Sequence, residues 1–342
     1  MSKTNAGRFF EDYAVGQVIE HAVPRTVGAG ERALYHALYP ARQALYSSDE
    51  FARGCGLAAA PLDDLIAFHT VFGKTVPDVS LNALANLGYA EGRWLAPVWP
   101  GDTLRSVSEV IGLKENSNGK SGVVWVRTRG TNQHGDPVLE YVRWVMVRKR
   151  DAASPAPETV IPDLSPALSA EQLVIPEGLD FSSYDFGLAG EPHRWGDYSV
   201  GEVIDHVDGV TIEEAEHMLA TRLWQNTAKV HFDATAREGG RLIYGGHVIS
   251  MARALSFNGL ANAQMIVGLN GGAHANPCHA GATLRAWSEV LDRAETTAPG
   301  VGALRLRLVA TKGGAAPALK GEDGRYLPEV LLDLDYWALM PM

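Results

Sequence analysis

Residues 226 to 234 read NTAKVHFDA and place His231 five positions after the amide Asn226. An imidazole has an ordinary pKa of about 6.5, so His231 can both take and give a proton at cellular pH. Asn226 has no titratable group and could position water or a carbonyl oxygen, but it cannot act as a base. These residue types favour proton transfer on a bound substrate, and roles in capping a turn are the alternative for both. Asp233 could orient His231 or start a following helix as its N-cap, and the sequence favours the structural role.

A glycine-rich stretch, YGGHVIS at 244 to 250, follows this frame. It precedes an apolar run and predicts the N-terminus of a helix, where the first backbone N–H groups are unpaired and the helix dipole favours negative charge. We therefore expect an oxyanion hole at the amides of Gly246 to Val248. His247 could line the same site, and a helix-capping or supporting role is the alternative.

The elements that must position these residues occur twice. DYAVGQVIEH at 12 to 21 matches DYSVGEVIDH at 197 to 206 in seven of ten positions. PVWPGDTLRSVSEV at 97 to 110 matches PCHAGATLRAWSEV at 277 to 290 in eight of fourteen, in the same order along the chain and at a similar offset. The sequence therefore predicts two homologous halves. We assign them to residues 8–150 and 179–342, joined by a linker at 151–178 rich in Pro, Ala and Ser.

Each half is expected to hold one buried helix and several strands. Apolar residues at helical spacing follow Pro61 in the first half and Gly246 in the second. Runs rich in β-branched and aromatic residues predict strands at 123–130, 139–149, 303–310 and 329–340, with hairpin turns at 114–122 and 132–136. A helix wrapped by an antiparallel sheet is the α+β arrangement called a hotdog. The fold prediction is a double hotdog of two tandem domains.

The bulk composition excludes several classes of protein. A formal net charge of −10 argues against a general nucleic-acid binder. No apolar run approaches the roughly 18 residues that a membrane span needs, and the N-terminus lacks a signal-peptide core. Cys55 and Cys278 are too few for a disulfide framework, so we expect reduced thiols and a cytoplasmic location.

RWLAPVWPGDTLRSVSEV at 93 to 110 and GDPVLEYVRWVMVRKR at 135 to 150 resemble the MaoC-like dehydratase family of hotdog proteins. Within that family the likeness runs nearly end to end with hydratases that act on mesaconyl-CoA, and includes SLNALANLGYAEGRW and GLKENSNGKSGVVWVR. The resemblance implies reversible hydration of mesaconyl-CoA, a branched unsaturated dicarboxylic thioester, to β-methylmalyl-CoA. It implies no metal and no further cofactor, because coenzyme A is part of the substrate.

The family's catalytic signature is Asp-x-Asn-Pro-x-His, usually followed by x-Asp. In the second half this frame falls on Asn226 to His231, where only the histidine and the trailing Asp233 match. In the first half it falls on Ala41 to Tyr46, without carboxylate or imidazole at either catalytic position, so that copy is expected to be silent. Ala41, Ala44 and Tyr46 would then line the pocket. His231 is the expected acid and base. The resemblance implies that a single hotdog builds its site between two subunits, so fusing two copies frees one of them to lose its acid and base. We also expect a homodimer or higher homo-oligomer.

An anionic substrate requires cations. For the free carboxylate the candidates are Arg222, Arg42 and Arg253, each near a catalytic frame or on the helix after it. For the CoA phosphates, at a rim, the candidates are Lys229, Arg237, Arg241 and Arg93. His274 and His279 stand where the first half has Trp94 and Trp99, but metal binding there is not expected without acidic or thiol companions.

Three alternatives remain open from the sequence. Hotdog proteins also include acyl-CoA thioesterases, and a hydratase could act on another enoyl-CoA. Loss of the acid at Asn226 could also mean that the protein only binds its ligand. The expected partner in each case is an acyl-CoA, with no nucleic acid and no membrane.

Overall fold

The computed structural model describes residues 3–313 and 318–342. Its strands are β1 (Val18–Thr26), β2 (Ala83–Trp94), β3 (Thr103–Glu115), β4 (Ser121–Thr131), β5 (Pro137–Arg148), β6 (Val203–Thr211), β7 (Ile266–His274), β8 (Thr283–Glu295), β9 (Val301–Lys312) and β10 (Val330–Pro341). Its longer helices are α1 (Ala29–Leu38), α4 (Asp64–Thr75), α6 (Glu214–Leu223) and α8 (Gly245–Leu255). The short helices are η1 (Phe10–Asp12), α2 (Ala44–Ser47), α3 (Asp49–Gly54), η2 (Val76–Ser80), η3 (Ala170–Gln172), α5 (Phe186–Ala189), η4 (Trp195–Asp197), α7 (Lys229–Phe232) and α9 (Phe257–Leu260).

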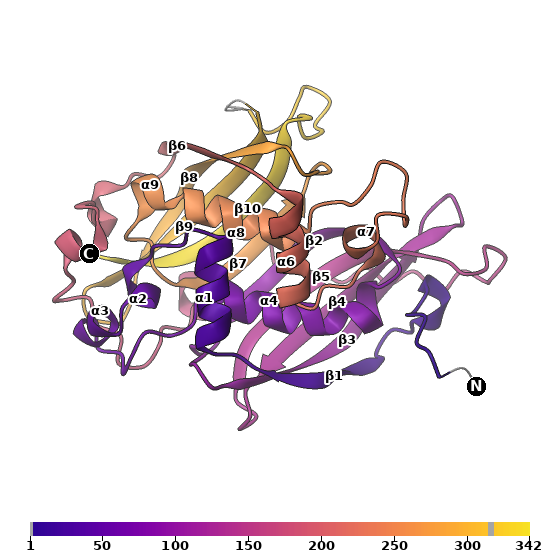
Figure 1. Ribbon diagram of the computed structural model, residues 1–342, viewed down its shortest axis with the longest axis horizontal. Coiled ribbons are helices and arrows are strands. Elements are labelled where there is room, and N and C mark those ends of the chain that lie inside the picture. Colours follow the sequence, from indigo (N-terminus) through magenta and orange to yellow (C-terminus); the bar gives the residue numbers. More distant parts are fainter. Residues whose placement is uncertain (1–2, 314–317) are drawn as a thin grey trace.

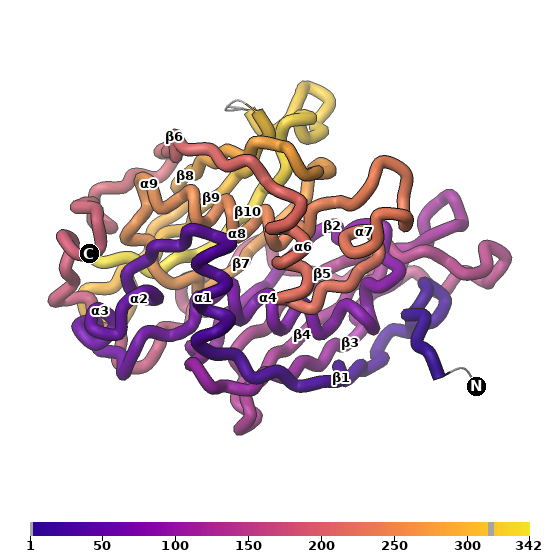
Figure 2. The backbone as a smooth tube through the Cα atoms, viewed as in Figure 1, coloured from indigo at the N-terminus to yellow at the C-terminus, as the bar shows by residue number. Residues whose placement is uncertain are grey.

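The strands of the described residues form a single antiparallel sheet in the order β1-β3-β4-β5-β2-β7-β10-β9-β8-β6. The order reads the same in both halves from the outer strand inward, and the halves meet where β2 pairs with β7, with Tyr89 opposite Gly272 and Arg93 opposite Gly268. Figures 1 and 2 show this continuous twisted sheet, with the helices gathered on one face and the two termini at opposite ends. The expected α+β double hotdog is confirmed, and its two sheets are continuous.

The repeat found in the sequence is visible in the elements. Strand β1 begins within the first matched segment and β6 begins at the equivalent position of its copy. Strands β3 and β8 begin at equivalent positions of the second matched pair, and the short helices α2 and α7 also correspond. The first half then forms α3, whereas the matching stretch of the second half, residues 233–244, is irregular.

The central helices α4 and α8 lie on the helical face of the sheet (Figure 1). Every residue of α4 is buried, and α8 is buried from Gly246 to Ala254. Their many apolar residues favour this burial, and the polar side chains that are buried with them find hydrogen-bond partners, as His69 of α4 does with Ser250 of α8. Helix α4 begins shortly after Pro61, because the Asp63 side chain accepts a hydrogen bond from the Leu65 amide and caps the helix there.

The two halves share one core. A single apolar cluster holds Val71 and Tyr89 of the first half together with Val248 and Tyr336 of the second. At Gly73 of α4 the backbone of the second half comes so close that an added Cβ would lie 1.7 Å from the Trp224 carbonyl oxygen. Glycine is therefore required at this crossing, and neither helix packs within its own half alone.

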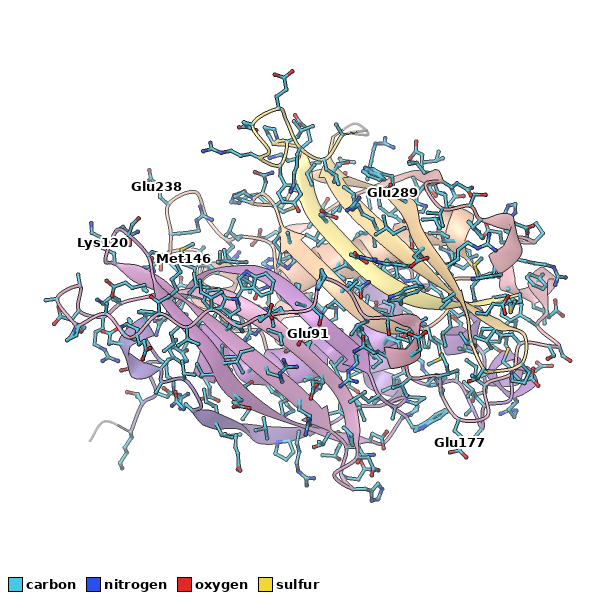
Figure 3. The ribbon with its side chains drawn as sticks, turned by 180° about the vertical axis from the view of Figure 1, so that it is seen from behind. Glu91, Lys120, Met146, Glu177, Glu238 and Glu289 are labelled. Carbon is cyan, nitrogen blue, oxygen red and sulfur yellow. The ribbon has the colours of Figure 1, made fainter. Side chains whose placement is uncertain are left out.

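The opposite face of the sheet carries ion pairs. Arg127 pairs with Glu91 at 2.8 Å and Arg305 with Asp335 at 2.6 Å. Figure 3 views this face and shows Glu91 near its centre, where the segment after β5 crosses the sheet. The Ser165 amide donates to Glu91 and the Leu168 amide donates to Asn270, which fastens that segment to both halves. Among the described residues, no helix combines the length and apolar character needed to cross a bilayer.

Candidate functional site

A cavity of about 340 Å³ lies between the halves on the helical side of the sheet. The first half contributes Phe72, Ser80, Tyr89 and Arg143 to its wall, and the second contributes Asn226, His231, Tyr244, Gly245, Val248 and His274. The predicted catalytic frame and the predicted helix N-terminus therefore meet in one cavity. A volume of this size accommodates the acyl part of a ligand.

His231 lies in the short helix α7 and contributes to the cavity wall. Its Nδ1–H donates to the Leu242 carbonyl oxygen at 2.9 Å, since a carbonyl can only accept. The neutral ring then carries its free electron pair on Nε2. Burial lowers the pKa of His231 to about 4. At neutral pH the imidazole is therefore an unprotonated base in a fixed tautomer.

Asn226 is almost fully buried, at 1% exposure, and also lines the cavity. Its side-chain carbonyl accepts a hydrogen bond from the Ala228 amide at 3.3 Å, which ties it to the turn before α7. Within the described residues, the Asn226 Nδ2 group has no acceptor. This nitrogen remains available as a donor to a ligand or a bound water.

The N-terminus of α8 presents two unused amides. The His247 and Val248 amides both donate to the Tyr244 carbonyl, at 2.9 and 3.4 Å, and so are engaged within the first turn. The amides of Gly245 and Gly246 have no acceptor in the described part of the chain. Of the residues expected to form the oxyanion site, Val248 lines the cavity but its amide is engaged, and Gly246 has an unused amide but is not a wall residue. Gly245 has both an unused amide and a place in the cavity wall. An added Cβ at Gly245 would lie 2.3 Å from the His274 ring, so only glycine fits there.

His247 differs from the expectation that it could line the site. It is fully buried, does not line the cavity, and its Nδ1 bonds to the Tyr39 hydroxyl at 3.0 Å. Residues three apart on a helix share a face, so Gly245 and Val248 face the cavity while His247 is turned away.

Asp233 does not orient His231. Its carboxylate accepts from the Thr235 amide at 2.9 Å and from the Thr235 hydroxyl at 2.7 Å, and it is exposed. No helix follows it directly in the described chain, so the favoured N-cap role is replaced by the capping of a turn. The imidazole is held instead by the Leu242 carbonyl.

Tyr244 is the wall residue beside His231, with ring centroids 5.9 Å apart. Its hydroxyl bonds to His69 Nδ1 at 3.1 Å, and His69 Nε2 bonds to the Ser250 hydroxyl at 2.7 Å. The Tyr244 amide donates to His217 Nε2 at 3.0 Å. Two buried histidines thus hold this tyrosine, and one of them is itself held by Ser250. Tyr244 opens the YGGHVIS stretch, but no role was predicted for it.

Of the two histidines that replace tryptophans, the structure brings only His274 to the cavity. His274 Nε2 bonds to the Tyr89 hydroxyl of the neighbouring strand at 3.1 Å, and burial lowers the pKa of His274 to about 4. His279 bonds to the Arg241 carbonyl outside the cavity wall. Across the described residues, no group of three or more His, Cys, Asp or Glu side chains is arranged to hold a metal ion.

None of the expected cations lines the cavity. Arg222 and Arg42 are exposed, Arg93 pairs with Glu140, Lys229 donates to Asn82, and Arg241 pairs with Glu214. Arg237, the other rim candidate, is also absent from the wall. Arg253 is buried and donates to the Ser256 hydroxyl and to the Ala263 and Gln264 carbonyls.

The cavity's own cation is Arg143, a residue that the sequence interpretation missed. It lies in β5 with no exposed surface. A signal was present, because residues 139, 141, 145 and 147 on the same side of that strand are all apolar and Arg143 interrupts them.

The equivalent place in the first half is filled. Asp64 occupies the position of Gly245 and accepts a hydrogen bond from Tyr46, the counterpart of His231, and another from the Ile266 amide at 2.6 Å. Asp64 and Trp94 line a cavity of only about 10 Å³, barely the space of one water. Burial raises the pKa of Asp64 to about 8. Ala41, Ala44 and Tyr46 pack in the core instead of lining the large cavity, contrary to expectation.

Comparisons with known proteins agree with this architecture. Residues 1–325 match the family model described as mesaconyl-CoA hydratase. The chain is 77% identical to a mesaconyl-CoA hydratase of Cereibacter sphaeroides and 56% identical to a beta-methylmalyl-CoA dehydratase of Chloroflexus aurantiacus, in each case over 99% of both chains. A crystal structure of a MaoC domain protein dehydratase from Chloroflexus aurantiacus superposes with a TM-score of 0.97 at 55% identity, covering 100% of this chain and 99% of that one. A Mycobacterium tuberculosis protein with a double hotdog fold, 22% identical, covers 97% of this chain and 98% of its own with a TM-score of 0.77 and shares the fold.

Proposed function

The chain belongs to the mesaconyl-CoA hydratase family and is a hydro-lyase, and we propose that it adds water reversibly to the double bond of mesaconyl-CoA to give β-methylmalyl-CoA. The observation that carries the proposal is one shared cavity. It holds a neutral histidine with a fixed tautomer, His231, and a helix N-terminus whose first two amides are unpaired among the described residues.

The thioester carbonyl binds at the start of α8. The Gly245 or Gly246 amide donates to its oxygen, and the donation strengthens as negative charge builds on that oxygen during the reaction. The helix dipole acts in the same direction. Stabilisation of the enolate-like oxygen is the largest requirement of this reaction, because water adds to a carbon conjugated with the carbonyl.

His231 transfers the protons. Nε2 takes a proton from a water while the water oxygen bonds to Cβ, and the electron pair of the double bond moves through Cα onto the thioester oxygen. The protonated Nε2 then returns the proton to Cα as the carbonyl re-forms. One imidazole serves both steps when water and proton add to the same face, and dehydration follows the same steps in reverse.

Asn226 replaces the acid of the family signature. Its free Nδ2 group holds the attacking water or the thioester oxygen, and its carbonyl stays bound to the turn. The first half supplies part of the cavity wall and no proton transfer of its own, since Tyr46 and Asp64 are bonded to one another. No metal or redox cofactor takes part, and two copies of the chain associate in the active form.

The direct test is incubation of the wild-type protein with mesaconyl-CoA. Loss of the absorbance of the conjugated thioester, with CoA still esterified and β-methylmalyl-CoA as product, supports the proposal. Release of free thiol identifies a thioesterase. If the absorbance of the conjugated thioester does not change, at enzyme concentrations high enough to bind it, the proposed hydration is contradicted.

A further inference from the structure

Arg143 is a charged residue in the core of the first half. It projects from β5 on the same side as Tyr141 and Val145, both of which are fully buried. Its guanidinium lies over the Phe72 ring, 4.2 Å from the ring centre. Burying a cation costs free energy unless a counter-ion neutralises its charge and acceptors bind its N–H groups. The partners of Arg143 therefore show whether its role is structural.

The partners of Arg143 do not match its charge. Nη2 donates to the Thr75 hydroxyl at 2.6 Å, and longer contacts of 3.4 and 3.5 Å reach the Ser80 hydroxyl. Nε is buried and has no acceptor within the described residues. No carboxylate in that part of the chain lies within ion-pair distance of the guanidinium. Two hydroxyls and an aromatic face leave a full positive charge and at least one donor unsatisfied.

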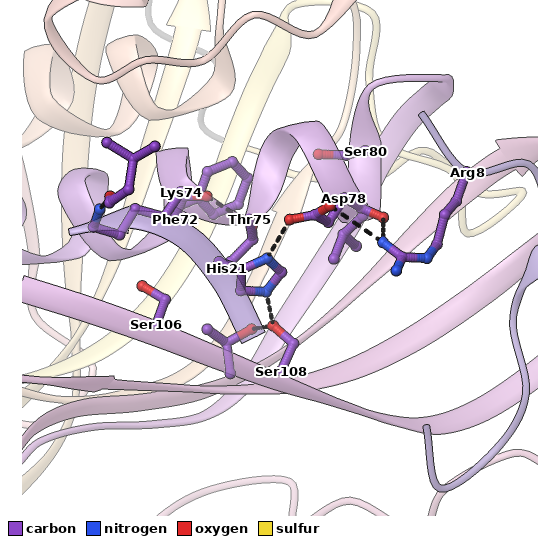
Figure 4. A network of polar contacts seen from close by, with 12 residues as sticks. Arg8, His21, Phe72, Lys74, Thr75, Asp78, Ser80, Ser106 and Ser108 are labelled. Carbon is purple, nitrogen blue, oxygen red and sulfur yellow. Dashed lines mark hydrogen bonds and ion pairs between the residues drawn. The ribbon is translucent and has the colours of Figure 1, made fainter. Parts of the chain in front are cut away.

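Asp78, which lies between Thr75 and Ser80 in the sequence, is already engaged by other side chains. Asp78 accepts from Arg8 at 3.3 Å and pairs with His21 at 3.0 Å. Figure 4 shows the Asp78 carboxylate directed at these two side chains, with Thr75 and Ser80 nearby. Asp78 therefore cannot serve as the counter-ion of Arg143.

The second half shows what a purely structural arginine looks like in this fold. In the first half, Val110 pairs with Val126, which pairs with Arg143 on the next strand. In the second half, the equivalent Val290 pairs with Leu306, which pairs with Tyr336. Tyr336 therefore stands where the first half has Arg143. The buried arginine of the second half, Arg253, comes from the helix instead. It donates to two backbone carbonyls and a hydroxyl. Arg143 has no such carbonyl among the described residues and, unlike Arg253, lines the cavity.

Arg143 lies along the cavity from the proton-transfer site. The Phe72 ring beneath its guanidinium is 5.9 Å from the Tyr244 ring, and the Tyr244 ring is 5.9 Å from that of His231. Tyr89, which bonds to His274, is the neighbour of Arg143 on the paired strand. One wall of aromatic rings thus joins the cation to the histidines.

We propose that Arg143 binds the free carboxylate of the acyl chain and selects a dicarboxylic enoyl thioester over one that ends in a methyl group. The assignment rests on the proposed function. In mesaconyl-CoA the carboxylate is attached to Cβ, the carbon that water attacks. The Nε and Nη groups offer the planar fork that binds a carboxylate through two hydrogen bonds. Pairing also removes the negative charge that would repel the incoming hydroxide.

The test compares two thioesters that differ only at this group: mesaconyl-CoA and 2-methylcrotonyl-CoA, which has a methyl group in place of the carboxylate. Wild-type protein should bind mesaconyl-CoA more tightly, on the order of 10²-fold for a charge-assisted pair in a closed cavity. Arg143→Gln should abolish that preference by weakening only mesaconyl-CoA, and Arg143→Lys should restore part of it. Arg129→Gln, on the opposite face of the sheet, is the matched control and should change neither affinity.

Binding is measured by calorimetry, and turnover of mesaconyl-CoA is followed in the same samples after thermal melting has verified the fold. A wild type without preference for the carboxylate overturns the assignment even if no Arg143 variant folds. If Arg143→Gln weakens the binding of both thioesters equally, or of neither, the assignment of Arg143 is also overturned. The proposed function still stands in that case, provided that the wild type hydrates mesaconyl-CoA. A wild type that does not hydrate mesaconyl-CoA overturns the proposed function and this assignment together.

Discussion

Arg143 of the first half and His231 of the second line the same cavity, although they lie far apart in the chain and each belongs to its own copy of the fold. The copies meet through the β2–β7 pairing and a shared core. The first copy has lost its own pocket to Asp64 and Tyr46 but still supplies wall residues to the other. Duplication has thus produced one composite site from two related halves.

Replacing Asn226 by aspartate should lower activity. The new carboxylate of Asn226→Asp would keep an acceptor for the Ala228 amide, but the buried Nδ2 donor would be lost. Loss of one neutral hydrogen bond to the ligand predicts a fall in kcat/KM of about 3 to 10-fold. Steady-state kinetics with mesaconyl-CoA measure this, and activity that holds or rises would show that the amide donor is not needed.

Gly245→Ala should damage the site without unfolding the chain. The new methyl group would press on the His274 ring and shift the start of α8, and a misplacement of about 1 Å can cost about 10²-fold in rate. Gly30→Ala in the first turn of α1 is the control, because nothing lies within 4 Å of its added Cβ. Comparable turnover numbers for the two variants, with matched melting temperatures, would argue against a tight fit at Gly245.

The pH dependence of hydration should reflect a buried base. In the proposed mechanism the neutral form of His231 is the active one, and burial lowers its pKa to about 4. Activity should therefore persist as the pH falls from 7 to 5 and decline only near pH 4. The neighbouring His217 and His274, with pKa values lowered to about 3 and about 4, remain neutral over the same range. The acidic limb of kcat/KM reports this pKa in the free enzyme. A midpoint near 6.5 would mean that the active base is exposed to water.

The repeat made much of the fold predictable. Two matched pairs of segments located both halves, and β-rich runs located four strands, because alternation and turn residues are local properties of the sequence. The strand pairing between the halves was not predictable in this way. The join at Tyr89 and Gly272 depends on contacts between segments that belong to different halves of the chain.

The site was only partly predictable for the same reason. His231 was predicted from its spacing in a family frame, and the structure places it in the cavity wall. Helix-start chemistry predicted Gly246 to Val248, of which only Val248 lies in that wall, together with the preceding Gly245. For His247 the sequence left a lining role and a supporting role open, because about 100° of rotation per residue decides which side chain of α8 faces the cavity; the structure places His247 outside the wall. Arg143 escaped the prediction because it lies far from both catalytic frames along the chain. Its position on the apolar side of β5, where the other half has Tyr336, would have identified it.

We propose that His231 carries out the proton transfers of mesaconyl-CoA hydration, while Tyr46, its counterpart in the first half, carries out none. The most direct measurement is kcat for hydration in His231→Gln beside Tyr46→Phe, each verified as folded by thermal melting. We predict a fall on the order of 10² to 10⁴-fold for His231→Gln and unchanged turnover per folded molecule for Tyr46→Phe. Near-normal turnover in His231→Gln would contradict the assignment of His231 as the acid and base.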